Sequence, residues 1–253
     1  MRTVLTLVVV TLATCTLGPV VLVAGLLGVR DKRDGIYQRC MHLWARAACW
    51  AAGARVEVHD DAGAVGLEGV VYIVNHVSWF DVFALAATLP RYSFVAKSEL
   101  RRIPLFGPAA AAAGIVFLER DNRKRAFESY KDAAAKVRDG RSVVVYPEGT
   151  RGYDYPLRPF KKGPFVLAIA SEALIVPTVV YGAREVMGKG TFRIRPGVIH
   201  LHFLEPIPTA GLQYADRGDV MTRVWQRMDD ALHTRYGVRP SDRAIAKANE
   251  RPV

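Results

Sequence analysis

The feature that most constrains this chain is a run without a single charged residue over residues 4–29. A helix of that length is long enough to cross a hydrocarbon core of about 30 Å. Gly18 and Pro19 interrupt the run midway, so a kinked span and a re-entrant hairpin both fit. We therefore expect the chain to begin with a membrane-embedded segment.

The charges on either side of this run predict its orientation. Arg30, Lys32 and Arg33 follow the run, whereas only Arg2 precedes it. The positive-inside bias therefore places the remainder of the chain in the cytoplasm. A secretory signal, or a lipoprotein whose mature chain begins at Cys15, is an alternative, but the apolar run continues well beyond such a cleavage point.

A second apolar element is predicted at Ile36–Ala52. Apolar and small residues recur on one helical face, while Arg39, His42 and Arg46 fall on another. Such a helix can lie in the membrane interface with its arginines towards phosphates, or it can pack against the globular part. Together with the first run it predicts a membrane-embedded helical pair.

The overall charge limits the classes of binding partner that we expect. Lys and Arg number 35 against 24 Asp and Glu, a formal net charge of +11. A basic protein attracts polyanions, here an anionic lipid surface or nucleic acid. No zinc-finger, RNA-recognition or basic-zipper pattern is recognisable, so we expect no nucleic-acid partner. Three sparse cysteines with no paired spacing predict neither a disulfide framework nor a zinc site.

From Gly53 onward, short apolar runs alternate with helical patterns, which predicts a globular α/β domain. Continuous apolar runs such as VVYIV and SVVVY predict strands buried on both faces of a parallel or mixed sheet. The predicted strands are residues 55–59, 70–74, 93–96, 115–118, 142–146, 175–181, 191–195 and 198–204. The predicted helices are residues 79–89, 99–112, 123–138, 165–171 and 220–234. Gly140 is suitably placed for a left-handed cap at the end of the helix over residues 123–138.

These patterns predict three parts. Residues 1–52 form the membrane-anchoring helices, residues 53–240 the single globular domain, and residues 241–253 a polar tail.

The segment NHVSWFD, residues 75–81, carries the first set of chemically active side chains. It follows a predicted strand, and the carboxyl ends of strands are where α/β sheets place ligands. His76 is suited to act as a general base, and Asp81 to orient and stabilise its ring. Five residues correspond to about 140° of rotation on a helix, so the two side chains can meet only if His76 precedes the helix. The alternative is that Ser78 and Asp81 merely cap the helix.

Two further segments supply polar groups. In YPEGTR, residues 146–151, a glycine lies beside a threonine hydroxyl and an arginine fork, which makes a plausible phosphate cradle or an ordinary turn. Lys97 and Arg120 each end a predicted strand, where the alternative is a solvated surface charge.

The order of these segments resembles the four-block signature of glycerolipid acyltransferases, and in particular the 1-acylglycerol-3-phosphate acyltransferase family. The blocks are NHVSWFD, then KSEL with IPLFG and FLER, then YPEGTR, then IVPTVV. The resemblance extends from about residue 70 to residue 181, and FKKG at residues 160–163 also fits. Gly152 stands where the family often has serine.

The resemblance implies roles for individual residues. His76 and Asp81 are the catalytic pair, and Pro177 shapes the acyl or donor side. The residues implied to bind the glycerol phosphate are Glu148, Gly149, Thr150 and Arg151, with help from Lys97 and Arg120.

The resemblance also implies a reaction. An acyl chain passes directly from acyl-CoA or acyl-carrier protein to the 2-hydroxyl of 1-acyl-sn-glycerol 3-phosphate, forming phosphatidic acid for phospholipid biosynthesis at the cytoplasmic face of the membrane. Neither a cofactor nor a metal ion is expected. One alternative is another acceptor, a different lysophospholipid or a lyso-aminolipid such as lyso-ornithine lipid. An alternative of another class is a membrane-anchored lipid-binding protein with a decayed site.

Overall fold

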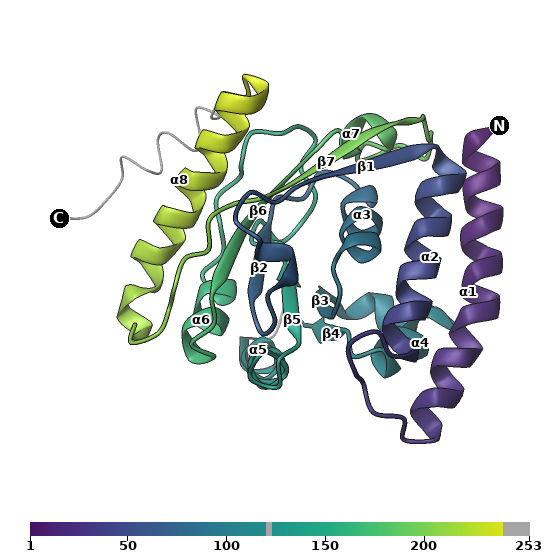
Figure 1. Ribbon diagram of the computed structural model, residues 1–253, viewed down its shortest axis with the longest axis horizontal. Coiled ribbons are helices and arrows are strands. Elements are labelled where there is room, and N and C mark those ends of the chain that lie inside the picture. Colours follow the sequence, from purple (N-terminus) through teal and green to yellow (C-terminus); the bar gives the residue numbers. More distant parts are fainter. Residues whose placement is uncertain (120–122, 240–253) are drawn as a thin grey trace.

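A mixed sheet forms the centre of the molecule in the computed structural model, which describes residues 1–119 and 123–239 (Figure 1). Within those residues the strand order is β1-β7-β6-β2-β5-β3-β4. Neighbouring strands are parallel except β6 and β7, which are antiparallel. The predicted mixed-sheet α/β fold is therefore confirmed. The tail predicted at residues 241–253 lies outside the described residues, as does Arg120.

The strands follow the apolar runs of the sequence. They are β1 Ala54–His59, β2 Val71–Val74, β3 Tyr92–Lys97, β4 Val116–Leu118, β5 Ser142–Val145, β6 Ile175–Tyr181 and β7 Gly197–Phe203. The strand predicted at residues 191–195 is wrong. Its backbone groups bond elsewhere: the Ile194 N–H donates to the Thr3 hydroxyl and the Arg195 N–H to the Val186 carbonyl.

The helices also match most of the predicted segments. They are α1 Arg2–Leu26, α2 Ile36–Ala52, α3 Phe80–Thr88, α4 Phe106–Ala112, α5 Arg123–Arg138, α6 Gly163–Ala170, α7 Ala183–Val186 and α8 Arg217–Tyr236, with 3₁₀ turns η1 Ala64–Gly66, η2 Ser98–Arg102 and η3 Tyr214–Asp216. The continuous helix predicted at residues 99–112 is wrong. Pro104 and Leu105, the latter at φ +61°, separate η2 from α4.

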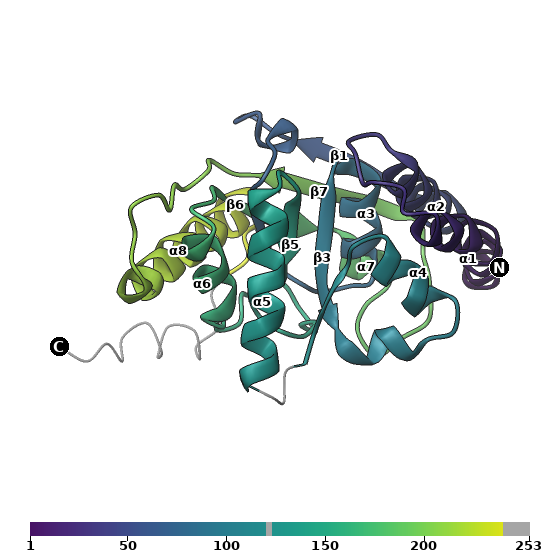
Figure 2. The same cartoon turned by 90° about the horizontal axis from the view of Figure 1, so that it is seen from below.

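The sheet is covered on both faces (Figures 1 and 2). Side chains alternate along β2, so that Tyr72 and Val74 pack into the core beneath α3 and α7, while Val71 and Ile73 pack into the core beneath α5, α6 and α8. All four are fully buried. The loops at the carboxyl ends of β2 and β5 are thereby held on a rigid base.

The helices α1 and α2 lie side by side against the domain, with α4 contacting α1 (Figure 2). A small third core joins them, formed by Val21, Ala24, Tyr37, Cys40 and the α4 side. The helix α1 continues through Pro19, so the hairpin considered within residues 4–29 is wrong and the chain reverses only after Leu26. By length and composition α1 can cross a membrane, and only 17% of its most apolar stretch is buried inside the molecule.

Candidate active site

His76 and Asp81 are in direct contact at the carboxyl end of β2. His76 lies in the loop after the strand, and Asp81 lies in the first turn of α3. The His76 Nδ1 atom is 2.8 Å from the Asp81 Oδ2 atom. The Asp81 side chain is 0% exposed and the His76 side chain 15% exposed. The structure thus meets the geometric condition that the five-residue spacing imposes.

The carboxylate of Asp81 also binds the backbone of the loop. Its Oδ2 atom accepts the Val77 N–H at 2.7 Å and the Ser78 N–H at 2.8 Å. The Ser78 hydroxyl meanwhile accepts the Phe80 N–H at 3.0 Å and donates to the Met187 carbonyl at 2.6 Å. Asp81 therefore holds the loop at the start of α3 and orients His76 with the same oxygen, so the two roles considered for it are compatible.

These contacts define which nitrogen of His76 is available for chemistry. Because the Asp81 oxygen is an acceptor, Nδ1 carries the hydrogen and Nε2 keeps its lone pair. The ring of His76 also stacks on Tyr146, with centroids 3.9 Å apart and planes 19° apart. Sequence reasoning missed this role of Tyr146, for which its place beside the PEGT turn was the only signal.

The backbone of His76 is held from both sides by the segment after β5. The His76 N–H donates to the Glu148 Oε1 atom at 2.9 Å, and the His76 carbonyl accepts the Gly152 N–H at 2.7 Å. Asn75, the residue before His76, is held by β6. Its side-chain Nδ2 donates to the Val180 carbonyl at 3.0 Å, and its Oδ1 accepts the Val180 N–H at 2.7 Å. The first and third sequence blocks therefore form one unit around His76.

Glu148 lies behind His76 and not on the wall of the cavity. Burial raises the pKa of its carboxyl group to about 7, although the His76 N–H and the Arg158 guanidinium lower it in part. Near neutral pH the group is thus poised between its two forms. Pro177 is likewise off the cavity wall, buried within β6 opposite Ile73.

A cavity of about 350 Å³ opens in front of His76. Its polar end is formed by His76, Lys97, Gly149, Thr150 and Arg151. The rest of its wall is apolar and comes mostly from α1, α2, α3, α4 and β3, including Leu17, Val21, Met41, Trp44, Phe83, Phe106 and Ile115. A polar head and a long hydrocarbon chain can therefore be held together here.

The polar end carries positive charge on separate segments. The Arg151 guanidinium lies over the Trp79 ring, 5.1 Å from its centroid. Lys97 is 55% exposed and pairs with Glu99 at 2.6 Å. Gly149 has φ +76°, and a side chain there would meet the Lys161 Cε atom at 2.8 Å. Five of the eight predicted site residues therefore share the cavity, and Asp81 and Glu148 support His76 from behind, while Arg120 lies outside the described residues.

The sequence of this chain is similar to those of known acyltransferases. A sequence model of the family described as Acyltransferase matches residues 55–181, half of the chain. A 1-acyl-sn-glycerol-3-phosphate acyltransferase of Saccharomyces cerevisiae is 31% identical over 198 residues, 75% of this chain and 65% of that protein. The Homo sapiens enzyme of that name, form beta, is 34% identical over 166 residues, 65% of this chain and 60% of that protein.

These relatives are longer than the matched region, and the chain spans 61% and 54% of the first two curated relatives, an uncharacterised acyltransferase of Schizosaccharomyces pombe and the 1-acyl-sn-glycerol-3-phosphate acyltransferase of Cocos nucifera. Among solved structures, the crystal structure of the 1-acyl-sn-glycerophosphate acyltransferase PlsC from Thermotoga maritima superposes with a TM-score of 0.71 over 100% of both chains. At 21% identity that likeness concerns the fold.

Proposed function

Because this chain belongs to the acyltransferase family, we propose that it transfers an acyl chain from acyl-CoA or acyl-carrier protein to the 2-hydroxyl of 1-acyl-sn-glycerol 3-phosphate, forming phosphatidic acid in phospholipid biosynthesis. The observation that carries this proposal is the His76–Asp81 pair at the polar end of an apolar cavity.

In the proposed mechanism, His76 Nε2 removes the proton from the acceptor hydroxyl as its oxygen attacks the thioester carbonyl carbon. Asp81 stabilises the imidazolium that forms, since its Oδ2 atom already accepts the Nδ1 hydrogen at 2.8 Å. The new C–O bond forms, the C–S bond breaks, and the departing thiolate takes the proton back from His76. The thioester supplies the activated acyl group, so no cofactor or metal ion is required.

Transfer is direct in this proposal, without an acyl-enzyme. The Ser78 hydroxyl is occupied by its bond to the Met187 carbonyl. Ping-pong kinetics with a trapped acyl-enzyme would contradict direct transfer.

The positively charged end of the cavity supports a phosphate-bearing acceptor. Lys97 ends β3 and Arg151 lies on the segment after β5, and both line the cavity together with Gly149 and Thr150. We assign this end, with Arg120, to the glycerol phosphate. Glu148 contributes from behind by holding the His76 backbone.

Membrane association is supported by the helix α1. Its outward face is a band of exposed apolar side chains, among them Val8, Leu12, Val20 and Val23. We propose that α1, with α2 beside it, embeds residues 1–52 in the membrane and holds the domain of residues 53–240 at the cytoplasmic face, where the lysophospholipid acceptor resides.

The experiment that tests the function is a donor and acceptor panel with the purified full chain in detergent or lipid. Acyl-CoA and acyl-carrier protein are each offered with lysophosphatidic acid, lysophosphatidylcholine and lyso-ornithine lipid, and products are identified by mass. We expect phosphatidic acid as the main product. Preferred acylation of lyso-ornithine lipid would replace the proposed acceptor, and no turnover with any thioester would favour a lipid-binding protein with a decayed site.

A further inference from the structure

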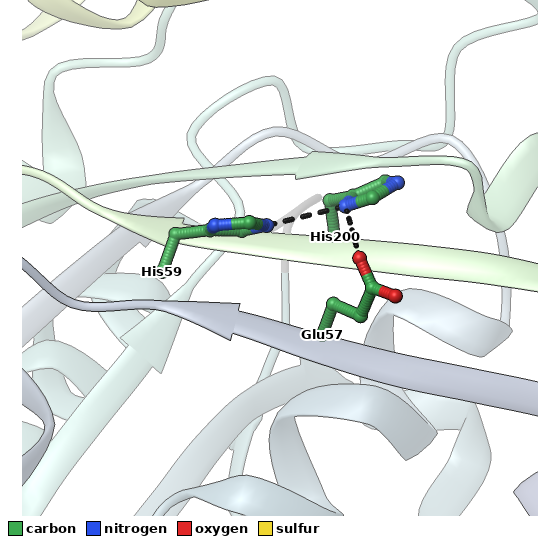
Figure 3. Close-up of side chains that lie close together, drawn as sticks. All are labelled: Glu57, His59 and His200. Atoms are coloured by element: carbon green, nitrogen blue, oxygen red, sulfur yellow. Dashed lines mark hydrogen bonds and ion pairs between the residues drawn. The ribbon is translucent and has the colours of Figure 1, made fainter.

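Four ionisable side chains gather on one face of β1 and β7, and none of them lines the cavity. Glu57 lies opposite His200 and His59 opposite His202 in the parallel register of these two strands. Alternate residues of a strand share a face, so all four project to the same side of the sheet. Figure 3 shows three of them, Glu57, His59 and His200, converging on one point.

The converging atoms are metal-ligand atoms at metal-ligand separations. The His59 Nε2 atom is 3.2 Å from the His200 Nδ1 atom, which is 3.3 Å from the Glu57 Oε2 atom. Zinc bonds of about 2.0–2.1 Å at tetrahedral angles place neighbouring ligand atoms about 3.3 Å apart. The ligand atoms of all three side chains lie within 4.8 Å of one another. Rotation of the partly exposed Glu57 side chain can close the remaining gap.

The Nδ1 atom of His200 faces two partners at once. A neutral imidazole nitrogen offers either one hydrogen or one lone pair. If it donates its hydrogen to Glu57, its bond to His59 weakens, and if it accepts from His59, its lone pair faces a carboxylate. A cation bound between the three groups removes this conflict, because each of them then directs a lone pair at the ion.

We infer that Glu57, His59 and His200 form a binding site for one divalent metal ion of zinc-like preference. Two imidazoles and one carboxylate suit Zn²⁺, and an exchangeable water completes the tetrahedron. This departs from the expectation that the chain holds no metal. That expectation rested on the spacing of the cysteines. The ligands proposed here are a glutamate and two histidines on strands separated by more than a hundred residues of sequence.

The neighbouring side chains orient the ligands. The Arg55 guanidinium holds the other oxygen of Glu57, Oε1, at 2.7 Å and leaves Oε2 for the ion. The ring of His202 stacks on His59 with centroids 4.2 Å apart and planes 11° apart. Such outer contacts fix the rotamers of metal ligands and strengthen their sites. The side chains of His200 and Glu57 are 27% and 34% exposed, so an ion and its water can reach them.

The position of the site separates it from the acyltransferase chemistry. The ligands lie on the edge strand β1 and its neighbour β7, and the His200 ring is 5.9 Å from the Tyr236 ring of α8. The wall of the cavity in front of His76 includes no residue of β1, β7 or α8. We assign the ion a structural role: it fastens the edge strand β1, which follows directly after α2, to β7.

The test uses the full chain without a histidine tag, in detergent, after treatment with a chelator. Zn²⁺ is titrated in competition with a chromophoric chelator, and Co²⁺ is added separately to record its visible absorption. We expect one Zn²⁺ per chain and the intense bands of four-coordinate Co²⁺. His59→Asn and His200→Asn should each weaken Zn²⁺ binding by about 100-fold or more. The matched control, His233→Asn, alters an exposed histidine on α8 and should bind as the wild type does.

Activity and melting temperature complete the test. Both ligand variants should keep acyl transfer, which shows that they fold, and Zn²⁺ should raise the melting temperature of the wild type but not theirs. Absence of saturable Zn²⁺ binding, or equal binding by both variants, would overturn the site. A Co²⁺ spectrum of the wild type without four-coordinate bands would also overturn the proposed site, independently of the variants.

Discussion

A single carboxylate oxygen organises the proposed active site. The Oδ2 atom of Asp81 holds the imidazole of His76 and two backbone N–H groups of the same loop. The tautomer of His76 is therefore fixed before any substrate binds, and Nε2 is ready to accept a proton. Such preorganisation avoids rearrangement during the reaction.

His76→Ala should lower kcat by about 10²–10⁴-fold, because the acceptor hydroxyl loses its base. The apolar wall and the cationic end remain, so KM for lysophosphatidic acid should change little. Steady-state kinetics on the purified variant checks this, with circular dichroism to confirm folding and His233→Ala as the control at an exposed histidine. Retention of most of the turnover would remove His76 from its role.

Glu148 gives a pH dependence of stability whose sign is fixed by burial. The pKa of its carboxyl group rises from 4.5 to about 7 on folding, so the folded state binds the proton more tightly. Stability from this group is complete below pH ~4.5 and is lost as pH rises through ~7, by about 3 kcal/mol at most. Glu148→Gln should abolish this loss while still accepting the His76 N–H.

Urea unfolding in mild detergent at several pH values measures this difference. The stability advantage of the Gln variant over the wild type should grow between pH ~5 and ~7.5 and then level off. A difference that stays constant over this interval would show that Glu148 titrates near its ordinary value in the folded protein.

Sequence reasoning reached the identity of these residues but not the position of each one. The five-residue spacing of His76 and Asp81 correctly required a loop followed by a helix. Glu148 was expected among the substrate-binding residues, yet it contacts the His76 backbone from behind. Such a contact joins two segments 72 residues apart, and only the packing of β2 against β5 brings them together.

Among helices and strands, those with a strong apolar period were predictable, and the errors occurred where local signals compete. A helical pattern over residues 99–112 ran through Pro104, and the structure breaks there. The β-like pattern at residues 191–195 finds its hydrogen bonds on α1 and α7 instead of a strand, which no local pattern reveals. Sequence reasoning also missed the contact between His59 of β1 and His200 of β7. The register of two paired strands depends on the whole sheet and not on a local pattern.

The close approach of α1 to Leu105, the residue just before α4, depends on a glycine. A Cβ atom at Gly18 would lie 3.1 Å from the Leu105 side chain, and Gly18 also lines the cavity. Gly18→Leu should push α1 outward and fill part of the apolar space. We expect kcat/KM for long-chain acyl donors to fall by about 10-fold or more, and short-chain donors to be less affected.

The matched control for this change is Val20→Leu, because Val20 is on the exposed face of the same helix and does not line the cavity. A series of acyl-CoA donors of increasing length gives the measurement. An equal loss for all donor lengths would indicate general disruption of α1 and not a shortened cavity.

At the scale of the whole molecule, one helix, α1, has an exposed apolar side and also forms part of the cavity wall. The inward side of α1 supplies Ala13, Thr14, Leu17, Gly18 and Val21 to that wall. Its outward side is the exposed apolar band, and the chain carries a net charge of +11 that favours an anionic surface. Deleting α1 would therefore remove the proposed membrane attachment and the substrate-binding wall together, and could not separate the two roles.

A charge on the outward side alone can separate these two roles of α1. Val8 and Leu12 are 49% and 58% exposed and do not line the cavity. An aspartate at the centre of a membrane helix costs about 2.5–3.5 kcal/mol, so the double variant Val8→Asp with Leu12→Asp should leave the bilayer.

Vesicle flotation should show its release, while activity on detergent-dispersed lysophosphatidic acid persists because the cavity wall is intact. Tyr214→Asp, which adds one aspartate at an exposed residue outside α1, should stay bound. If the double variant floats with the vesicles as the wild type does, α1 is a wall of the cavity only, and the membrane attachment lies elsewhere on the molecule.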